Sequence, residues 1–564
     1  MAVVAILIGF GVGLTRDLGE PWIGLHDWNG AFFSQLARNQ IRYPFALHNG
    51  MPIVAVGAEA PAEADQSFYS THPPGLVWLV AAWMSVFGES EAIARLLPII
   101  CSLPTLALLL RLWRQAFGPA HSALAGLFYS VMPLSVYFGR MVDHEAVCLF
   151  LMTVVGTLWI GFEYSRASLD LADRPTSIGK YGPRSYAILA GMCMTVIALI
   201  WVDWAGCLFA GLFALLLVRR SIAAKNGLRG PCAAVVVAMA LATCTMLTFL
   251  VYAGLDGRWS DLIAIFTSRA SDASGDAPGR SLAAPGSAWI NTEVNLTLPL
   301  IILAIAGLMF SIRMRMSGGL RPKPRPNTAT IGAAEPNQDP AQCDAASVLG
   351  LISLTGVIWL ALFYRQYLFH QYWIFYLGPM VASLAAGAVI TLARLFEARR
   401  RRVVQVLLAA AVATTLSHEI SGIHRYYSAH PPSLEADVNA WRGIAELTRP
   451  DDRIVLFRDP TFVETRGGYT FRNIIPPQFA YYADRAFTVE PDFNRVVELA
   501  DSHALFVMRL DDAVRFSAGL KPLRRLHPEQ LMGERYVIFD LRQPLIGGLQ
   551  GRGAASPALD SYKP

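Results

Sequence analysis

Long apolar blocks that end in clusters of Arg and Lys make up the first 420 residues of the chain. Since roughly 20 apolar residues cross a bilayer as a helix, this pattern predicts a polytopic α-helical membrane protein. The first block, Met1 to Leu14, is short for a span and has no basic segment or cleavage site. We therefore expect a retained anchor, or a true start that lies upstream. With this anchor we expect about eleven transmembrane helices. The others are predicted near residues 91–113, 120–138, 144–162, 185–201, 203–218, 232–252, 293–312, 347–364, 371–395 and 403–420.

One further apolar segment, Pro74 to Phe87, has the length of an interfacial or re-entrant helix, and we expect it to stay on the outer surface. If the amino terminus is cytoplasmic, the inner loops then hold most of the Arg and Lys residues, as the positive-inside rule requires. Treating Pro74 to Phe87 as a span would place the basic clusters outside. The Pro-rich and Gly-rich segment from Ser317 to Ala346 becomes a cytoplasmic linker in this topology.

The first outer loop, expected over residues 15–90, contains the stretch around which the chemistry is predicted to gather. At its centre is Asp27, flanked by His26 and Trp28 near a membrane boundary, where an acid is expensive and usually has a function. The alternative is that Asp27 only caps the next helix. The spacing that follows predicts an amphipathic helix suited to a bilayer surface. Its apolar face would carry Phe32, Phe33, Leu36, Ala37 and Ile41, and its polar face Gln35, Arg38, Asn39 and Arg42.

After residue 420 the hydropathy falls, and strand-like segments alternate with helix-like ones. This alternation predicts a small α/β domain, which the topology places outside the cytoplasm. We therefore divide the chain into a membrane domain at residues 1–420 and an extracytoplasmic α/β domain at residues 421–564. The tail shows no nucleotide-binding motif. Its expected strands lie at residues 454–457, 486–489, 504–508 and 536–539.

Composition supports the membrane class. The chain is 54% hydrophobic and 16% charged, and its formal net charge is +5. The basic residues lie between apolar blocks, where they orient a membrane protein, so we expect no nucleic-acid partner. Six of the seven cysteines lie in or beside predicted spans, and no disulfide framework is implied.

Acids and histidines converge on the predicted outer membrane boundary. Asp143, His144 and Glu145 open one span, and Asp203 occupies a very short outer turn between two others. These residues are candidates for second carboxylates or for acceptor binding. Acids at a helix amino terminus are also favoured by the helix dipole alone, by about 0.3 to 1 kcal/mol each, so a structural role stays open. The groups around His26 and His144 could also supply a divalent metal site, although no regular ligand spacing supports one.

The segment YRQYLFHQYW places Arg365 and His370 at an outer boundary among aromatic residues. Arg can bind a phosphate with two parallel hydrogen bonds, so this pair suits a phosphate group. The alternative is that Arg365 extends its charge to water from an apolar position.

Four motifs, taken in order, carry a family resemblance: HDWNGAFFSQLARN, THPPGLVWLVAAWMSVFGESEAIARLLP, GRMVDHEA and FHQYWIFYLGP. This order resembles the GT-C membrane glycosyltransferases of the dolichyl-phosphate-mannose protein mannosyltransferase and aminoarabinose transferase kind. The resemblance implies the GT-C fold, a sugar donor on a polyprenyl phosphate, and an acidic catalytic base in the first outer loop, which corresponds to Asp27. The protein mannosyltransferases have an adjacent Asp-Glu pair there, whereas Trp28 follows Asp27. The sugar and the acceptor therefore stay open.

The resemblance implies an inverting transfer from the lipid-linked sugar to a hydroxyl of a glycan, lipid or protein at the outer face of a bacterial inner or plasma membrane. Asp27 would remove the acceptor proton, and Arg365, His370 and Arg140 would stabilise the leaving phosphate. Two other classes stay open. A transporter or flippase of lipid-linked sugars would show charges in the middle of spans or repeated halves, and neither is clear. A scaffold would carry only a partner-binding outer domain.

Overall fold

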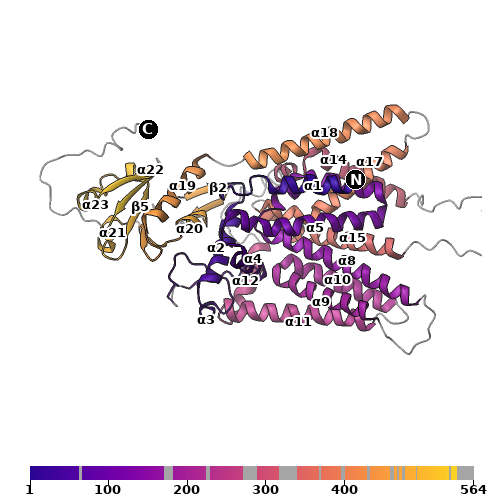
Figure 1. Ribbon diagram of the computed structural model, residues 1–564, viewed down its shortest axis with the longest axis horizontal. Helices are drawn as coiled ribbons and strands as arrows, with labels where there is room; N and C mark the ends of the chain where they lie inside the picture. The colour runs from indigo at the N-terminus through magenta and orange to yellow at the C-terminus, as the bar shows by residue number, and fades with distance from the viewer. Residues whose placement is uncertain are drawn as a thin grey trace, which may run out of the picture. The chain divides into compact units, whose positions relative to one another are not determined.

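Helices dominate the protein, which is seen in a computed structural model (Figure 1). The structure describes residues 1–62, 66–170, 182–223, 229–270, 289–316, 340–367, 370–395, 401–428, 432–457, 463–466, 469–472, 477–490, 492–532 and 535–542.

The chain divides into two compact units. The first, here called the membrane unit, consists of Met1–Leu18, Ser70–Leu79 and Arg95–Ser428. The second consists of Gly19–Tyr69, Val80–Ala94 and Ala429–Pro564, and is here called the loop-tail unit. The residues after 428 thus fold together with most of the loop that contains Asp27.

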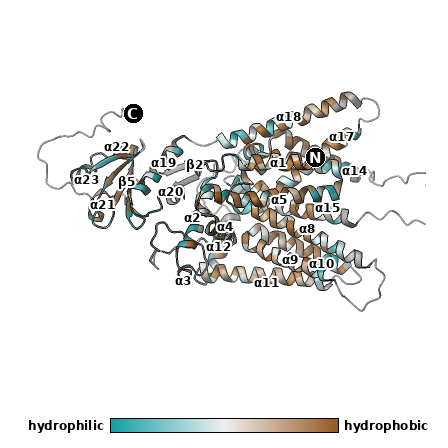
Figure 2. Cartoon of the chain, viewed as in Figure 1, coloured by the Kyte–Doolittle hydropathy of each residue, from teal (hydrophilic) through white to brown (hydrophobic). Residues whose placement is uncertain are grey.

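The membrane unit is built from apolar helices, which stand out by hydropathy in Figure 2. Its helices are α1 (Ala2–Thr15), α5 (Glu91–Phe117), α6 (Pro119–Val131), α7 (Pro133–Phe138), α8 (His144–Asp170), α9 (Pro183–Val202), α10 (Trp204–Ala223), α11 (Arg229–Gly254), α12 (Trp259–Ala270), α14 (Leu298–Met316), α15 (Pro340–Leu362), α16 (Tyr364–Tyr367), η2 (Gln371–Leu377), α17 (Gly378–Leu395) and α18 (Arg401–Ser428). The first four residues of α5 belong to the other unit.

Within the described residues, eight helices are long and apolar enough to cross a membrane. A ninth span results if the bent pair Trp289–Leu296 and Leu298–Arg313 is counted as one. The predicted class, a polytopic helical membrane protein, is confirmed, but two of the eleven expected spans do not meet this length. The first helix has 14 residues. The expected span over 120–138 is divided into α6 and α7, because Met132 is extended and Pro133 opens the second helix.

The short apolar helix α4 (Gly75–Phe87) has 13 residues, in agreement with the expectation that this segment is too short to span. Its first residues belong to the membrane unit and its remaining residues to the loop-tail unit. Gly75 approaches α9 so closely that a Cβ atom there would lie 2.4 Å from the carbonyl oxygen of Trp201. The ring of Trp78 stacks on that of Trp201, with centroids 5.2 Å apart. The start of α4 is therefore held against the end of α9.

The loop-tail unit contains a five-stranded sheet with the order β4-β1-β5-β7-β6. Strand β1 pairs in parallel with β4 and β5, and β7 pairs in antiparallel with β5 and β6. Its sheet elements and helices are α2 (Trp28–Arg42), α3 (Phe45–His48), α19 (Pro432–Leu447), β1 (Arg453–Leu456), α20 (Pro477–Ala483), β4 (Ala486–Val489), α21 (Phe493–Leu499), β5 (Leu505–Arg509), α22 (Leu510–Arg515), α23 (Lys521–Leu526), β6 (Glu529–Met532) and β7 (Tyr536–Asp540). A separate hairpin joins β2 (Val463–Arg466) to β3 (Tyr469–Arg472).

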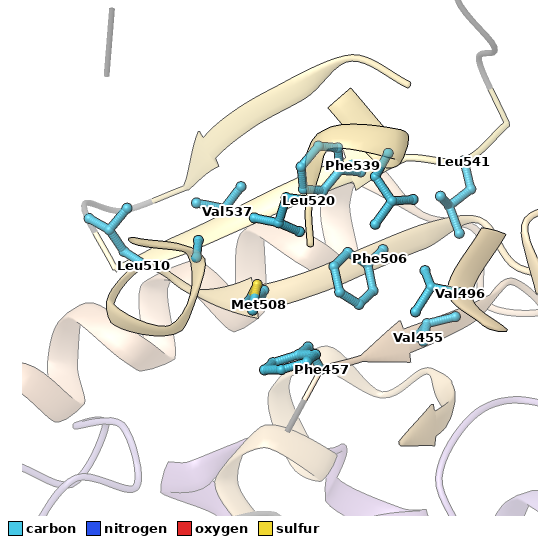
Figure 3. Packing of buried hydrophobic residues seen from close by; sticks show 12 residues of the cluster. Val455, Phe457, Val496, Phe506, Met508, Leu510, Leu520, Val537, Phe539 and Leu541 are labelled. Carbon is cyan, nitrogen blue, oxygen red and sulfur yellow. The ribbon is translucent and has the colours of Figure 1, made fainter. Parts of the chain in front are cut away.

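The core of this sheet is visible in Figure 3, where Val455, Phe506, Met508 and Phe539 project from β1, β5 and β7 into one buried cluster. Helices α21, α22 and α23 contribute further apolar residues to it, and Phe457 stacks on Phe493 with centroids 4.7 Å apart. Fully burying an aromatic or aliphatic side chain is worth about 1.5 to 3 kcal/mol. The predicted C-terminal α/β fold is therefore confirmed, with its four expected strands present as β1, β4, β5 and β7.

Candidate functional site

A buried group of ionisable side chains lies in the membrane unit where several helices begin or end. His72 Nδ1 lies 3.0 Å from Asp203 Oδ1, and the Tyr376 hydroxyl donates to Asp203 Oδ2 over 3.0 Å. His72 precedes α4, Asp203 separates α9 from α10, and Tyr376 belongs to η2. Each of the three side chains is almost completely removed from solvent. We call His72, Asp143, His144, Glu145, Asp203 and Tyr376 the buried polar cluster.

The position of Asp203 follows from the tight turn between α9 and α10. Its backbone is extended, and Oδ1 accepts a hydrogen bond from the Trp204 N–H over 2.8 Å, which satisfies one free donor at the start of α10. Gly206 allows this turn, because a Cβ atom there would lie 2.2 Å from the Leu199 carbonyl oxygen. The Trp204 indole donates to the Thr71 carbonyl over 2.9 Å and so fixes the residue next to His72.

The charge state of Asp203 is set by its neighbours. Burial by itself would raise the pKa of this carboxyl, but the hydrogen bond with His72, the charges of His144 and His72, and the Tyr376 hydroxyl outweigh it. The net effect lowers the pKa of Asp203 below its ordinary value. Asp203 is therefore a carboxylate at neutral pH, held by donors on two sides.

The motif before α8 joins the same cluster. The rings of His72 and His144 stack with centroids 4.4 Å apart, and His144 Nδ1 lies 2.9 Å from Asp143 Oδ1. Asp143 Oδ1 also accepts the His144 N–H over 2.8 Å. Glu145 is buried, interacts electrostatically with Asp143 and Asp203, and has an Oε2 atom without a hydrogen-bond partner in the part of the chain that the structure describes. The predicted candidates Asp143, His144, Glu145 and Asp203 are thus brought together.

Two members of the buried polar cluster were not predicted. His72 stands before the two prolines of the THPPG motif, and this position could have drawn attention to it. Tyr376 lies within an aromatic block, FHQYWIFYLGP, in which no local signal distinguishes one tyrosine from another. Across the described residues, no group of three or more His, Cys, Asp or Glu side chains is arranged to hold a metal ion.

Arg140 lies in the same unit, where it is buried and donates to the Arg16 carbonyl. Its guanidinium also lies over the ring of Tyr427, 4.6 Å from the centroid. His370 hydrogen-bonds through Nδ1 to the Tyr372 hydroxyl over 2.6 Å and stacks on Trp373. Arg365 belongs to α16, but its side chain lies outside the described structure. A phosphate-binding role for these three residues stays a prediction.

Asp27 lies in the loop-tail unit, immediately before α2, and is 6% exposed. Its Oδ2 atom accepts the Gly24 N–H over 3.0 Å, so it closes the turn that precedes it. Within the described first turn of α2, the Asp27 side chain makes no capping hydrogen bond. Its role as a general base or as a structural residue stays a prediction.

The turn before Asp27 is fixed by Trp22, which is fully buried. The Trp22 N–H donates to the Tyr482 hydroxyl over 2.7 Å, and Tyr482 donates in turn to Glu91 Oε1 over 2.9 Å. Gly30, in the first turn of α2, leaves room for the indole, because a Cβ atom there would lie 2.3 Å from the ring. Residues of the tail and the first residue of α5 thus hold the loop that carries Asp27.

Helix α2 differs from expectation on both faces. Its apolar face, which we expected to lie on a bilayer surface, is largely buried in the protein, although Ile41 is 41% exposed. Its polar face is buried too, with Gln35, Arg38 and Asn39 at 4%, 8% and 0% exposure. These side chains are stabilised by partners within the unit: Arg38 donates to the Tyr481 carbonyl and pairs with Glu89, and Asn39 binds two carbonyl groups of residues 53 and 55. The helix is therefore not a free amphipathic helix with a solvated polar face.

Comparison with known proteins shows which family and which solved structures the chain is similar to. A model of the dolichyl-phosphate-mannose-protein mannosyltransferase family matches residues 71–168. No curated protein sequence matches the chain. Among solved structures, ArnT from Cupriavidus metallidurans bound to undecaprenyl phosphate is similar over 96% of this chain and 97% of that chain, with 13% identity and a TM-score of 0.56.

An archaeal enzyme has the same fold. The apo oligosaccharyltransferase from Archaeoglobus fulgidus is similar over 90% of this chain and 69% of that chain, with 12% identity and a TM-score of 0.52. A second structure from that organism, the oligosaccharyltransferase AglB in complex with an inhibitory peptide and a dolichol-phosphate, is similar over 93% of this chain and 72% of that chain, with 12% identity and a TM-score of 0.51.

The predicted resemblance and the predicted GT-C fold are confirmed by these similarities. The apolar helices and the shared fold make the chain an integral membrane protein. The family match over residues 71–168, together with the fold, supports the predicted class, a glycosyltransferase.

Proposed function

We propose that the protein transfers a sugar from a polyprenyl-phosphate-linked donor to a hydroxyl group of an acceptor glycan, lipid or protein. The observation that carries this proposal is the buried polar cluster, four of whose residues, His72, Asp143, His144 and Glu145, lie inside the matched segment 71–168. Ionisable groups next to hydrocarbon are costly and usually serve a function. Here they lie at span ends, the level at which a lipid phosphate resides.

The proposed reaction is a single inverting displacement. The acceptor oxygen attacks the anomeric carbon, the bond from that carbon to the phosphate oxygen breaks, and the lipid phosphate departs with the bonding electrons. Asp27 accepts the proton of the acceptor hydroxyl, a form of general-base help worth typically about 10² to 10⁴-fold. Its burial and its fixed turn support this role, because a positioned base needs little reorganisation. Attack opposite the leaving group inverts the anomeric configuration.

The departing phosphate is an anion, and it needs positive charge or hydrogen-bond donors more than it needs a general acid. We propose Arg140, His370 and Arg365 for this task. The carboxylates of the buried polar cluster, Asp143, Glu145 and Asp203, together with His144, are proposed to bind hydroxyl groups of the substrates. Asp203 suits this role since it is already held in its charged form by His72 and Tyr376.

We further propose that catalysis takes place at the extracytoplasmic face of a bacterial inner or plasma membrane. The distribution of Arg and Lys between the loops supports this orientation. A reporter that is active only outside the cytoplasm should give signal when fused after Leu434 and none when fused near Asn327. The opposite result would overturn the proposed sidedness.

The transfer itself is tested with the purified full chain in nanodiscs, a set of polyprenyl-phosphate sugars and a labelled envelope extract as acceptor. We expect release of free polyprenyl phosphate that depends on the acceptor, together with a labelled acceptor product that carries the sugar in the inverted configuration. A transporter or flippase would instead move the intact lipid-linked sugar across a vesicle membrane without cleaving its sugar-phosphate bond. Movement of the intact lipid without cleavage would reject the proposed function.

A further inference from the structure

A second polar region lies in the membrane unit, at the corner of the bent helix pair Trp289–Leu296 and Leu298–Arg313. The two helices meet at 94°. The corner residue, Thr297, has a φ of 53°, in the left-handed region that β-branched residues rarely adopt. Such backbone strain persists only where the surroundings impose it, often at functional sites. Broken helices at membrane depth are tolerated where they line a binding site.

Glu419 of α18 faces this corner. It is fully buried, and its Oε1 atom accepts a hydrogen bond from the Thr297 hydroxyl. Its Oε2 atom is also buried and has no hydrogen-bond partner among the residues that the structure describes. Gly422, one turn further along α18, permits the close approach, because a Cβ atom there would lie 2.6 Å from Pro133 Cγ and 3.4 Å from Thr297 Cγ2. A fully buried acid inside an apolar helix is a candidate functional group.

The neighbouring amides and phenols form a hydrogen-bonded network. The Tyr426 hydroxyl donates to Asn295 Oδ1, and Asn295 Nδ2 donates to the Asn291 carbonyl over 2.7 Å. Gln371 Nε2 donates to Asn291 Oδ1 over 2.9 Å. The Gln371 Oε1 atom, however, is buried and has no partner within the described part of the chain. Glu419 and Gln371 therefore each present a buried oxygen with capacity for a further hydrogen bond.

A buried carboxyl oxygen and a buried amide oxygen, both without partners among the described residues, suit an uncharged polar ligand. The hydroxyl groups of a sugar can hydrogen-bond to both, because each hydroxyl donates as well as accepts. Aromatic rings, which sugars commonly contact through their C–H faces, are present as well: Tyr426 stacks on Tyr137 with centroids 4.9 Å apart. Leaving buried oxygens unpaired is unfavourable, and a bound sugar would supply the missing hydrogen-bond partners.

We propose that Glu419 and Gln371, at the corner formed by Thr297, are part of a subsite that binds the hydroxyl groups of the donor sugar and so determines which lipid-linked sugar the protein accepts. This inference rests on the proposed function, because it takes the ligand to be a lipid-linked sugar. It assigns sugar recognition to the bent helix pair and α18, separately from the buried polar cluster.

The test compares the affinity of the full chain in nanodiscs for undecaprenyl phosphate with its affinity for a panel of undecaprenyl-phosphate hexoses and pentoses, measured by native mass spectrometry. For the wild type we expect at least one glycosylated lipid to bind roughly tenfold more tightly than the bare lipid phosphate. Glu419→Gln should remove most of that advantage and leave binding of undecaprenyl phosphate unchanged. Gln371→Met, which removes the amide oxygen at similar size, should reduce the same advantage, so the result does not depend on one variant. Asp261→Asn, an exposed carboxylate of α12, serves as the matched control.

Each outcome is decisive. Unchanged sugar preference in both variants would overturn the subsite, and so would an equal loss of affinity for bare and glycosylated lipids, which would assign the network a structural role. Sodium or potassium ions that stabilise the wild type but not Glu419→Gln against heat would assign the site to a cation and overturn the proposal. A wild type that binds neither lipid would contradict the proposed function itself, a result distinct from all of these.

Discussion

Arg42 and Asp484 form a two-pronged ion pair although 442 positions separate them in the sequence. Arg42 Nη1 donates to Oδ1 over 3.0 Å, and Nη2 donates to Oδ2 over 2.6 Å. The first residue ends α2, and the second follows α20. Bidentate pairs of this kind fix geometry as well as adding energy. The orientation of α2, and with it the loop that carries Asp27, is therefore set by the C-terminal part of the chain.

Asp484→Asn tests this anchoring. Asn tolerates the positive φ of 44° at this position, so the substitution removes the charge and keeps the backbone. Because both partners are partly exposed, we expect a loss of about 1 to 3 kcal/mol, seen as a lower Tm of the full chain in detergent. The control is Asp511→Asn, since the Asp511 side chain is 71% exposed and lies 3.6 Å from Arg509. Equal Tm values for the two variants would contradict the anchoring role.

The contrast between α2 and its partners shows what the sequence can and cannot predict. The helical spacing of Phe33, Leu36 and Ala37 identified the apolar face, because hydrophobic periodicity is a local property. The burial of Arg38 could not be predicted, because its partners Glu89 and the Tyr481 carbonyl come from distant segments. The burial of Gln35 and Asn39 on the same face could not be predicted either, because it also depends on how distant segments pack.

The buried polar cluster divides in the same way. Asp143, His144, Glu145 and Asp203 could be found because an acid at the end of an apolar block is conspicuous. Tyr376 could not, because its role depends on the packing that brings η2 to the turn between α9 and α10. Strand positions in the tail were predictable from apolar runs, whereas the polar strand β6, with the sequence Glu-Gln-Leu-Met, carried no such signal.

Gly30→Ala tests whether the contact of α2 with Trp22 holds the loop in place. A methyl group on Gly30 would lie 2.3 Å from the indole ring of Trp22. Because both residues are buried, the loop or the helix must shift. Overpacking of this kind typically costs about 1 to 3 kcal/mol. We expect a lower Tm together with a lower rate of sugar transfer. Gly19→Ala is the matched control, because nothing lies within 4 Å of the added methyl group there.

Because His26 is buried, we expect the stability of the loop-tail unit to fall in acid. Burial lowers the pKa of its imidazole to about 4, whereas the unfolded chain titrates near 6.5. Between these values the unfolded state binds a proton that the folded state does not, so stability is complete above pH 6.5 and falls as the pH decreases toward 4. The slope from this group is at most about 1.4 kcal/mol per pH unit.

The measurement is the Tm of the full chain at several pH values from about 7.5 to about 4.5, a range that includes the ordinary pKa of histidine. His26→Asn accepts the positive φ of 61° and does not titrate, so its Tm should fall less with acid than that of the wild type. His424→Gln in α18 controls for the loss of a histidine elsewhere. If His26→Asn keeps the full acid sensitivity of the wild type, another group is responsible.

The last prediction concerns Asp27 and separates its proposed role as a base from a structural role. The Asp27 carboxylate accepts the Gly24 N–H, and Asn can keep this bond through its amide oxygen. Asp27→Asn should therefore leave the Tm and the affinity for the lipid-linked donor nearly unchanged. It should lower kcat by roughly 10² to 10⁴-fold, because the amide cannot take the acceptor proton. Asp27→Glu should also transfer poorly, since one methylene moves the carboxylate by about 1 Å. A purified Asp27→Asn protein that transfers sugar at the normal rate would show that this carboxylate only shapes the turn.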